Sequence, residues 1–374
     1  MSGIYGSRGI SIASGKGASV RDSEGREYLD FYCGSGAALF GHAHPVLKQA
    51  LVEAAELPWT IGLGMGSAVR DSFKARLNDI LPDRSVFYCN SGTEAMEAAL
   101  KLATSLRPGK KKVLALRRAF HGRTIGALSL TFNPQYRKEW AHLLPPVQHV
   151  KPEELPGAVD ADTAVVFVEP VQGEGGVHPL APSLGEAITE ACRTTGALLV
   201  SDEIQSGWGR CGALSASPLA GLEPDILCFA KGVAGGMPIG LMLWKKELGD
   251  FSASGHGSTY GGNPLSLAVA NASLKLLDDE GYPEKARAGG EFFRTLLAEI
   301  DSPLISEIRG MGLLNGVELT VKAVPVVKRM QEMGVLALPA GPSVVRFLPP
   351  FPAGDADFLK AASVFAEALK EEGR

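Results

Sequence analysis

The sequence predicts an α/β protein with a mostly parallel sheet, and two apolar runs carry this prediction. Residues 197–200 and 226–230 have the length and composition of buried strands. The first run leads into Asp202 and the second into Lys231. Ligands of open α/β sheets bind at the carboxyl edge of the strands, so we expect this acid and this amine to face a ligand there.

Lys231 has the setting of a reactive amine. It follows apolar residues and precedes a glycine-rich turn, so it should be partly desolvated, with a lowered pKa. A neutral amine can form a Schiff base with an aldehyde cofactor. Pyridoxal phosphate (PLP) also needs a carboxylate beside its ring nitrogen, and Asp202 could supply it. Taken alone, the two residues leave another interpretation open, in which Asp202 caps a helix and Lys231 is an ordinary surface lysine.

Composition excludes several other classes of protein. The 374 residues are long enough for one large domain and a smaller one, and a net charge of -4 gives no reason to expect nucleic acid or an anionic membrane as partner. The N-terminus lacks the apolar core of a signal peptide, and no run approaches a membrane span, so we expect a cytoplasmic protein. The five cysteines show no CxxC spacing, so we expect neither a disulfide framework nor a metal site.

A phosphate site is predicted where a short apolar strand, residues 85–89, leads into a helix. Ser91 and Glu94 have the spacing of a capping box, with Gly92 and Thr93 between them. The free N–H groups and the dipole of a helix N-terminus attract anions. The same residues can therefore both start the helix and bind phosphate.

A loop with an aromatic and a basic residue follows the next predicted strand, residues 112–116. In this loop, Phe120 could stack on a planar ring and Arg123 could hold a carboxylate through two hydrogen bonds. Residues 133–155 lack periodicity and are expected to run over the surface.

Two carboxylates, Glu169 and Glu174, follow the predicted strand at residues 164–168. They could be structural or could manage the charge of a substrate. Arg346 lies between apolar neighbours and therefore needs an anionic partner.

The pattern along the chain predicts a change of architecture near residue 282. A hairpin is expected at 18–32, and a strand at 239–244 and a helix at 265–277 complete the large unit. The elements expected after this point are helices at 284–299, 323–333 and 355–371 and strands at 306–309, 312–318 and 344–348. We predict an N-terminal segment at 1–40 that belongs to the small domain, a large domain at 41–280, and a small α+β domain at 281–374.

Seven motifs occur in a fixed order along the chain: SGTEAMEAALKLA (91–103), FHGRT (120–124), EPVQGEGGV (169–177), SDEIQSGWGR (201–210), AKG (230–232), HGSTYGGNP (256–264) and VRFLPP (345–350). With these motifs the sequence resembles the class-III aminotransferases over essentially its full length. The resemblance implies PLP fold type I, which is aspartate-aminotransferase-like, and PLP as the cofactor.

The resemblance also implies roles at the ring of the cofactor. Lys231 would form the imine and move the substrate proton, and Asp202 would pair with the pyridinium nitrogen. Gln205 would bind the phenolic oxygen and Phe120 would stack on the ring, with His121 also in the cofactor site.

The phosphate, by the same resemblance, would be bound by Gly92 and Thr93. Thr259, together with Ser258, would reach that phosphate from the other subunit of a homodimer.

The substrate would be held by charged residues. Arg346 would bind the α-carboxylate of glutamate, and Glu174 would pair with Arg346 when an amine substrate occupies the site. Arg123 would hold the second carboxylate.

Within the family, the chain resembles the acetylornithine and the carrier-linked lysine/ornithine transaminases, and residues 335–351 look closest to the latter. Those enzymes act on a terminal amine tethered to LysW, a small acidic carrier protein. Ser35 stands where transaminases of free ornithine carry tyrosine, so we expect an open substrate pocket. The basic residues 110–112, Arg117 and Arg118 could meet an acidic partner, or could be ordinary solvated surface.

The implied reaction is a ping-pong transfer between glutamate/2-oxoglutarate and a terminal amine in lysine or arginine biosynthesis. N-acetylornithine, ornithine or 4-aminobutyrate are alternative substrates, and an aminomutase or racemase is an alternative within PLP chemistry. A dehydrogenase is excluded because no GxGxxG follows a strand. Met96, Ser206 and Trp208 depart from the common family residues, so they bear on substrate preference.

Overall fold

A seven-stranded sheet forms the centre of the computed structural model, which describes residues 6–372. The strands lie in the order β4-β12-β11-β10-β7-β5-β6. Their bounds are β4 (Arg84–Cys89), β5 (Lys112–Leu116), β6 (Gln148–Val150), β7 (Thr163–Val168), β10 (Leu198–Asp202), β11 (Ile226–Phe229) and β12 (Gly240–Lys245). β12 runs antiparallel to both of its neighbours and the other pairs are parallel. The prediction of an α/β protein with a mostly parallel sheet is therefore confirmed.

The edge strand β6 contradicts one expectation. It lies inside residues 133–155, which were expected to form only a surface excursion, and it pairs with β5. Gln148 is exposed and His149 is only half-buried, so this edge strand lacks the apolar run that marks the central strands.

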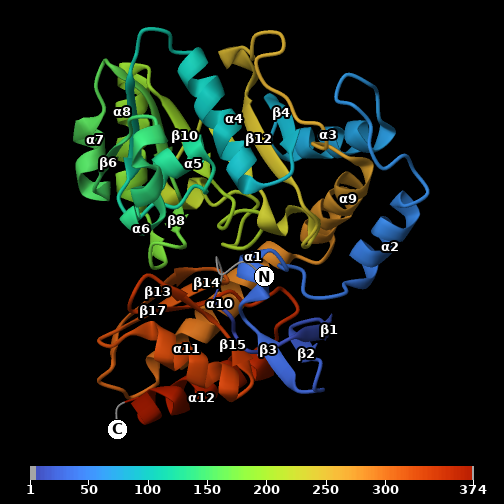
Figure 1. Ribbon diagram of the computed structural model, residues 1–374, viewed down its shortest axis with the longest axis vertical. Coiled ribbons are helices and arrows are strands. Elements are labelled where there is room, and N and C mark those ends of the chain that lie inside the picture. Colours follow the sequence, from blue (N-terminus) through green and yellow to red (C-terminus); the bar gives the residue numbers. More distant parts are fainter. Residues whose placement is uncertain (1–5, 373–374) are drawn as a thin grey trace.

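Helices cover both faces of the large sheet (Figure 1). One face packs against α4 (Gly92–Ser105) and α5 (Ile125–Leu130), and the other against α3 (Ala68–Ile80), α7 (Leu155–Ala158), α8 (Pro182–Thr195) and α9 (Pro264–Asp279), with α2 (Pro45–Ala54) against α9. Leu198 and Val200 of β10 face the α4 side and Leu199 faces the α8 side. Burial on both faces explains why the central strands are apolar runs without alternation. Within residues 6–372, no helix has the length and hydropathy of a membrane span.

The start of α4 is set by local side chains. The Ser91 hydroxyl accepts a hydrogen bond from the Glu94 amide at 3.3 Å, as a capping residue does. The Glu94 carboxylate accepts from the Asn90 amide at 3.0 Å, one residue earlier than in the standard capping box.

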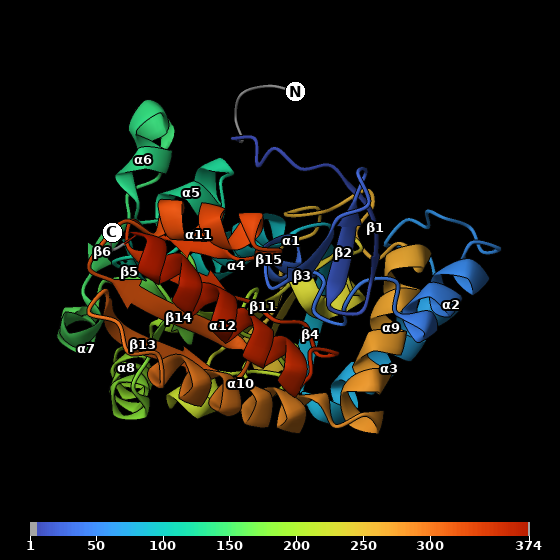
Figure 2. The ribbon, with the colours of Figure 1, turned by 90° about the horizontal axis from the view of Figure 1, so that it is seen from below.

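A second, antiparallel sheet lies beneath the large one. Its order is β13 (Ile305–Met311), β14 (Leu314–Leu319), β17 (Val344–Phe347) and β16 (Leu338–Ala340). The helices α10 (Tyr282–Ala298), α11 (Ala323–Glu332) and α12 (Asp355–Glu372) cover the side away from the large sheet (Figure 2).

The N-terminal strands join this lower layer. β1 (Ile12–Lys16), β2 (Ser19–Asp22) and β3 (Glu27–Asp30) form a sheet whose fourth strand is β15 (Val335–Leu336), parallel to β3. This pairing supports grouping the N-terminal segment with the C-terminal one (Figure 1). The division at 1–40, 41–280 and 281–374 stays a prediction.

Phe293 of α10 packs against residues from both the N-terminal and the C-terminal parts of the chain. Its ring lies 5.7 Å from that of Phe31, 5.2 Å from that of Phe347 and 5.4 Å from that of Phe358. All four side chains are buried. Edge and tilted contacts of this kind add to the free energy gained by burial alone.

Replacing Phe293 with alanine should lower the free energy of unfolding by about 3–5 kcal/mol, because a cavity would open between the two chain ends. Denaturant unfolding would measure this change. Leu359→Ala on α12 is the control, because Leu359 is 51% exposed and its loss should cost about 0.5 kcal/mol or less. Equal losses in the two variants would contradict this account of the lower layer.

Candidate active site

A cavity of about 420 Å³ opens at the carboxyl edge of the large sheet. Asp202 ends β10, Lys231 comes two residues after β11, and Gly92 and Thr93 begin α4, and all four line this cavity. Parallel strands bring these chain positions to one edge, although they are far apart in sequence. The structure thus places a buried acid, an amine and a helix N-terminus around one space.

Asp202 is held by two hydrogen bonds. One carboxylate oxygen accepts from Nδ1 of His121 at 2.7 Å, and the other accepts from the Ile204 amide at 3.0 Å. Both side chains are buried, and within the described residues Nε2 of His121 has no hydrogen-bond partner. These two hydrogen bonds fix the position of the carboxylate at the cavity wall.

Lys231 sits on a strained backbone. Its φ is +36°, a left-handed conformation that lysine rarely adopts, at the start of a short 3₁₀ turn, Lys231–Ala234. Burial lowers the pKa of the Lys231 amine, and the Glu174 carboxylate only partly opposes this effect. The neutral amine is therefore easier to form here than on a solvated lysine.

Glu169 is a second buried acid near Asp202 and was not among the assigned site residues. Burial and the Asp202 carboxylate raise the pKa of Glu169 well above its usual range, so this carboxyl favours its neutral form. The ligand atoms of His121, Glu169 and Asp202 all lie within 4.8 Å of one another. The His121–Asp202 hydrogen bond already occupies one ligand atom of each of these two residues. The signal in the sequence was a Glu-Pro pair at a strand end.

Close backbone approaches shape the opposite end of the cavity. A Cβ on Gly92 would lie 2.7 Å from the Ile204 side chain. A Cβ on Gly122 would lie 2.2 Å from the Thr93 hydroxyl, and Gly122 has φ of +131°. Glycine is required at both positions, and together they leave the positive end of α4 facing the cavity.

Phe120 and Arg123 lie on the wall and rim of the cavity. The Phe120 ring contacts the Tyr136 ring edge-on at 5.8 Å. The Arg123 guanidinium lies 4.9 Å from the centre of the Tyr136 ring, and the Arg123 side chain is exposed. An exposed guanidinium on an aromatic ring is well placed to meet an incoming carboxylate.

Arg346 has the anionic partner that its apolar neighbours predict. Its side chain is 1% exposed and pairs with Glu174 at 2.8 Å. It also donates to the Gln205 side chain at 2.9 Å. Burial acts to raise the pKa of Glu174, but the positive charges of Arg346, Lys231 and Arg123 together outweigh it and lower that pKa. Glu174 is therefore charged and neutralises Arg346.

Arg346 and three other predicted residues are not among those that line this cavity. Ser35 donates to the Tyr32 hydroxyl at 3.3 Å within a left-handed turn. Ser258 accepts from the Asn90 side chain at 3.2 Å, and Thr259 is exposed. Their roles, like those of the residues on the cavity wall, stay predictions.

The structure divides the basic residues that were expected to form one surface. Lys110 and Lys112 precede or begin β5, whereas Arg117 and Arg118 follow its other end. Five residues of strand separate the groups by about 16 Å. Lys112 also pairs with Asp160 at 2.8 Å. The expectation of one basic patch is wrong, because a strand carries its two ends to opposite edges of the sheet. Only the two arginines lie at the edge that holds the cavity.

A larger cavity, of about 690 Å³, lies at that opposite end of β5. It is lined by Lys111, Lys112, Arg137 and Lys138 among others. It lacks the buried acids and the buried amine of the smaller cavity, which therefore remains the site of chemistry.

Comparisons with known proteins agree with this geometry. The model of the family Aminotransferase class-III matches residues 5–369. A [LysW]-aminoadipate semialdehyde/glutamate semialdehyde transaminase of Sulfolobus acidocaldarius is 38% identical and covers 98% of this chain and 96% of its own. The acetylornithine aminotransferase of Bacillus subtilis is 36% identical, with 98% and 96% covered. The solved ornithine aminotransferase of Toxoplasma gondii, whose crystals show partial occupancy of PLP at the active site, is 33% identical, with a TM-score of 0.94 over 100% of this chain and 92% of its own. These likenesses confirm the predicted fold.

The pH dependence of Lys231 reactivity should reveal its setting. Burial disfavours the charged amine, so in protein freed of any bound aldehyde the neutral, reactive form should appear at a lower pH than on solvated lysines, whose pKa is about 10.4. Modification by a neutral amine-directed reagent, followed by peptide mass spectrometry across pH, would measure this midpoint. A midpoint equal to that of the surface lysines would contradict the assignment.

Proposed function

The chain belongs to the class-III aminotransferases, and from this premise we propose that it exchanges an amino group between glutamate and the terminal amine of a LysW-linked lysine or ornithine. The buried Glu174–Arg346 pair beside Lys231 is the observation that carries the proposal, because it lets one pocket accept two kinds of substrate. The names of the LysW-specific relatives support the carrier-linked form of the substrate.

The residues on the cavity wall fit PLP, the cofactor of this enzyme. When bound, PLP supplies an aldehyde and a protonated ring that withdraws electrons. Asp202 would hold the ring nitrogen, because its carboxylate is buried and fixed by His121. The amides of Gly92 and Thr93 at the N-terminus of α4 would hold the phosphate.

Two further side chains would position the ring. Phe120 would stack on it, and Gln205 would bind its phenolic oxygen, since both line the cavity. The Lys231 Nζ atom would hold the aldehyde until the substrate amine takes its place, and the freed amine, whose pKa is lowered by burial, would then accept and return the substrate proton.

The Glu174–Arg346 pair would adapt the site to each substrate. When glutamate binds, Glu174 would move away so that Arg346 binds the α-carboxylate, and Arg123 would hold the second carboxylate. When a terminal amine binds, no carboxylate reaches Arg346, and Glu174 would neutralise it. The pair is needed because a buried guanidinium without a partner costs several kcal/mol.

An exposed apolar surface beside the cavity supports a homodimer. Trp59 is 64% exposed, Met65 is 69% exposed and Tyr260 is 62% exposed. Arg70 donates to the carbonyls of Met65 and Gly262, so the loops that carry these residues lie side by side. Large exposed apolar groups that gather in one place mark an interface.

The partner subunit would complete the phosphate site. Ser258 contacts Asn90, a residue of the cavity wall, so this loop borders the entrance. We propose that Thr259, with Ser258, reaches the phosphate held by the other copy.

The five cysteines are buried and free, which fits a reducing compartment and a cytoplasmic enzyme.

Single-turnover conversion of the bound cofactor to its amino form should rank the substrates. Glutamate and carrier-linked lysine should react fast, and free lysine, free ornithine, N-acetylornithine and 4-aminobutyrate slowly, because only the carrier adds contacts outside the cavity. Absorbance of the cofactor would follow each reaction, with Lys231→Ala as the inactive control. If N-acetylornithine matches the carrier-linked amine, the enzyme is an acetylornithine aminotransferase.

Arg117 tests the docking of the acidic carrier. Its side chain is exposed just after β5, at the sheet edge that holds the cavity, whereas Arg118 contacts His178 at 3.2 Å and is left unchanged. Arg117→Glu should raise the KM for carrier-linked lysine about tenfold and leave the KM for glutamate unchanged, because a like charge repels the carrier. Lys112→Glu at the far end of β5 is the matched control. Equal effects of Arg117→Glu on both substrates would exclude this docking surface.

A further inference from the structure

A row of three residues crosses the lower sheet beside the active site. Arg309 of β13 pairs directly with Gly316 of β14, and Gly316 pairs directly with Arg346 of β17. Side chains of directly paired residues lie on the same face of an antiparallel sheet. Arg309 and Arg346 therefore project from one face, two strands and about 10 Å apart, with a glycine between them.

The loop that carries Glu174 lies across this row. It runs from β8 (Val171–Gln172) to β9 (His178–Pro179). Val177 occupies the space above Gly316, where an added Cβ would lie 2.7 Å from the Val177 Cβ. Glu174 reaches Arg346 on one side of the glycine. On the other side, Arg309 donates to the same loop.

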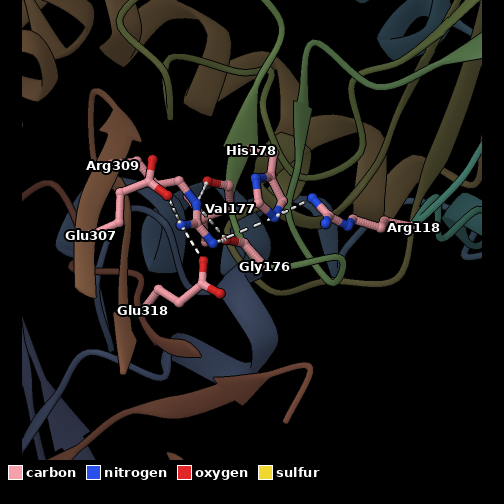
Figure 3. Close-up of polar contacts among 7 residues, drawn as sticks. All are labelled: Arg118, Gly176, Val177, His178, Glu307, Arg309 and Glu318. Carbon is pink, nitrogen blue, oxygen red and sulfur yellow. Dashed lines mark hydrogen bonds and ion pairs between the residues drawn. The ribbon is translucent and has the colours of Figure 1, made fainter. Parts of the chain in front are cut away.

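The Arg309 side chain donates hydrogen bonds to backbone carbonyls of this loop (Figure 3). Its Nη2 atom donates to the Gly176 carbonyl at 2.7 Å, and its Nε atom donates to the Val177 carbonyl at 3.0 Å. Val177 has φ of +56°, a strained conformation for a β-branched residue. Such a conformation persists only when contacts with the surroundings stabilise it. Here Arg309 donates to the Val177 carbonyl, and Gly316 leaves space for the Val177 side chain.

Other side chains fix Arg309 in turn (Figure 3). Its Nη1 atom lies 2.6 Å from a carboxylate oxygen of Glu307 and 2.6 Å from one of Glu318. His178 Nε2 lies 3.4 Å from Arg309 and 3.2 Å from Arg118. Burial and the two arginines lower the pKa of His178 to about 4, so at neutral pH the ring accepts from both guanidinium groups.

We propose that Arg309 is a positioning residue that favours the closed state, in which Glu174 is paired with Arg346, over the open state, in which the two side chains have separated. Arg309 thereby sets the preference between terminal amines and glutamate. This inference rests on the proposed function of that pair. The closed state needs Glu174 in one place, and Arg309 binds the carbonyls two and three residues beyond it. The open state has no such need, because Glu174 has then left Arg346. Loss of Arg309 would therefore weaken the closed state and spare the open one.

The test compares both half-reactions in the PLP-loaded Arg309→Met enzyme. The kcat/KM for the terminal amine that the wild type uses best should fall about tenfold relative to that for glutamate, since hydrogen bonds from a charged donor are lost. In Arg309→Lys this ratio of kcat/KM values should lie between that of the wild type and that of Arg309→Met, because an ammonium group cannot bind two carbonyls and two carboxylates together.

Arg287→Met is the matched control. Arg287 lies on α10 and donates to the Gly212 carbonyl, so it also joins the lower layer to the upper one, but away from Glu174. Arg287→Met should change the kcat/KM values of both half-reactions by the same factor. The same proportional change in Arg309→Met, with the substrate ratio unaltered, would overturn the proposal.

Inhibition by glutarate gives a second measurement that needs no terminal amine. Glutarate has two carboxylates and no amine, so it requires Arg346 to be free of Glu174. Its inhibition constant should fall severalfold in Arg309→Met and stay unchanged in Arg287→Met. A weaker or unchanged glutarate affinity would overturn the role of Arg309. Failure of the wild type to use any terminal amine would instead overturn the proposed function and leave this measurement valid.

Discussion

A buried positive charge that must always have a partner is the constraint behind the substrate site. Arg346 is 1% exposed, and an isolated guanidinium in such a place costs several kcal/mol. Glu174 meets this requirement from a loop, not from a strand, so it can also leave. Without a partner, the buried guanidinium would destabilise the protein. The proposed exchange between two substrates would rely on this arrangement, in which Arg346 lies on a strand and Glu174 on a loop.

The chemistry of the amine depends on a different part of the molecule. Lys231 and Asp202 follow strands of the large sheet, whose two faces are covered by helices, so their positions are rigid. Two acids near each other also have different environments. Asp202 accepts hydrogen bonds from His121 and a backbone amide, whereas burial raises the pKa of Glu169. The cavity wall thus carries one carboxyl group that two hydrogen bonds hold in place and a second whose charged form burial disfavours.

The proposed substrate preference, in contrast, would depend on how the two sheets meet. Glu174 lies in the loop between β8 and β9, and Arg346 lies in the lower sheet. The Arg309 contacts with Gly176 and Val177 join this loop to the lower sheet. Glu174 and Arg346 therefore meet across two layers, whereas Lys231 and Asp202 both belong to the layer of the large sheet.

By itself, the sequence determined the fold class, most of the strands and helices, and the family, because apolar runs, turn residues and ordered motifs are local properties of the chain. The sequence also predicted that Asp202 and Lys231 share one edge of the sheet, because each stands at or just after the end of a strand. The tertiary structure alone decided the partners. Strand order and direction placed His121 on Asp202, separated Lys112 from Arg117, and set Arg309, Gly316 and Arg346 in one row. These relations join residues far apart in the chain through pairing and packing, and no local pattern records them.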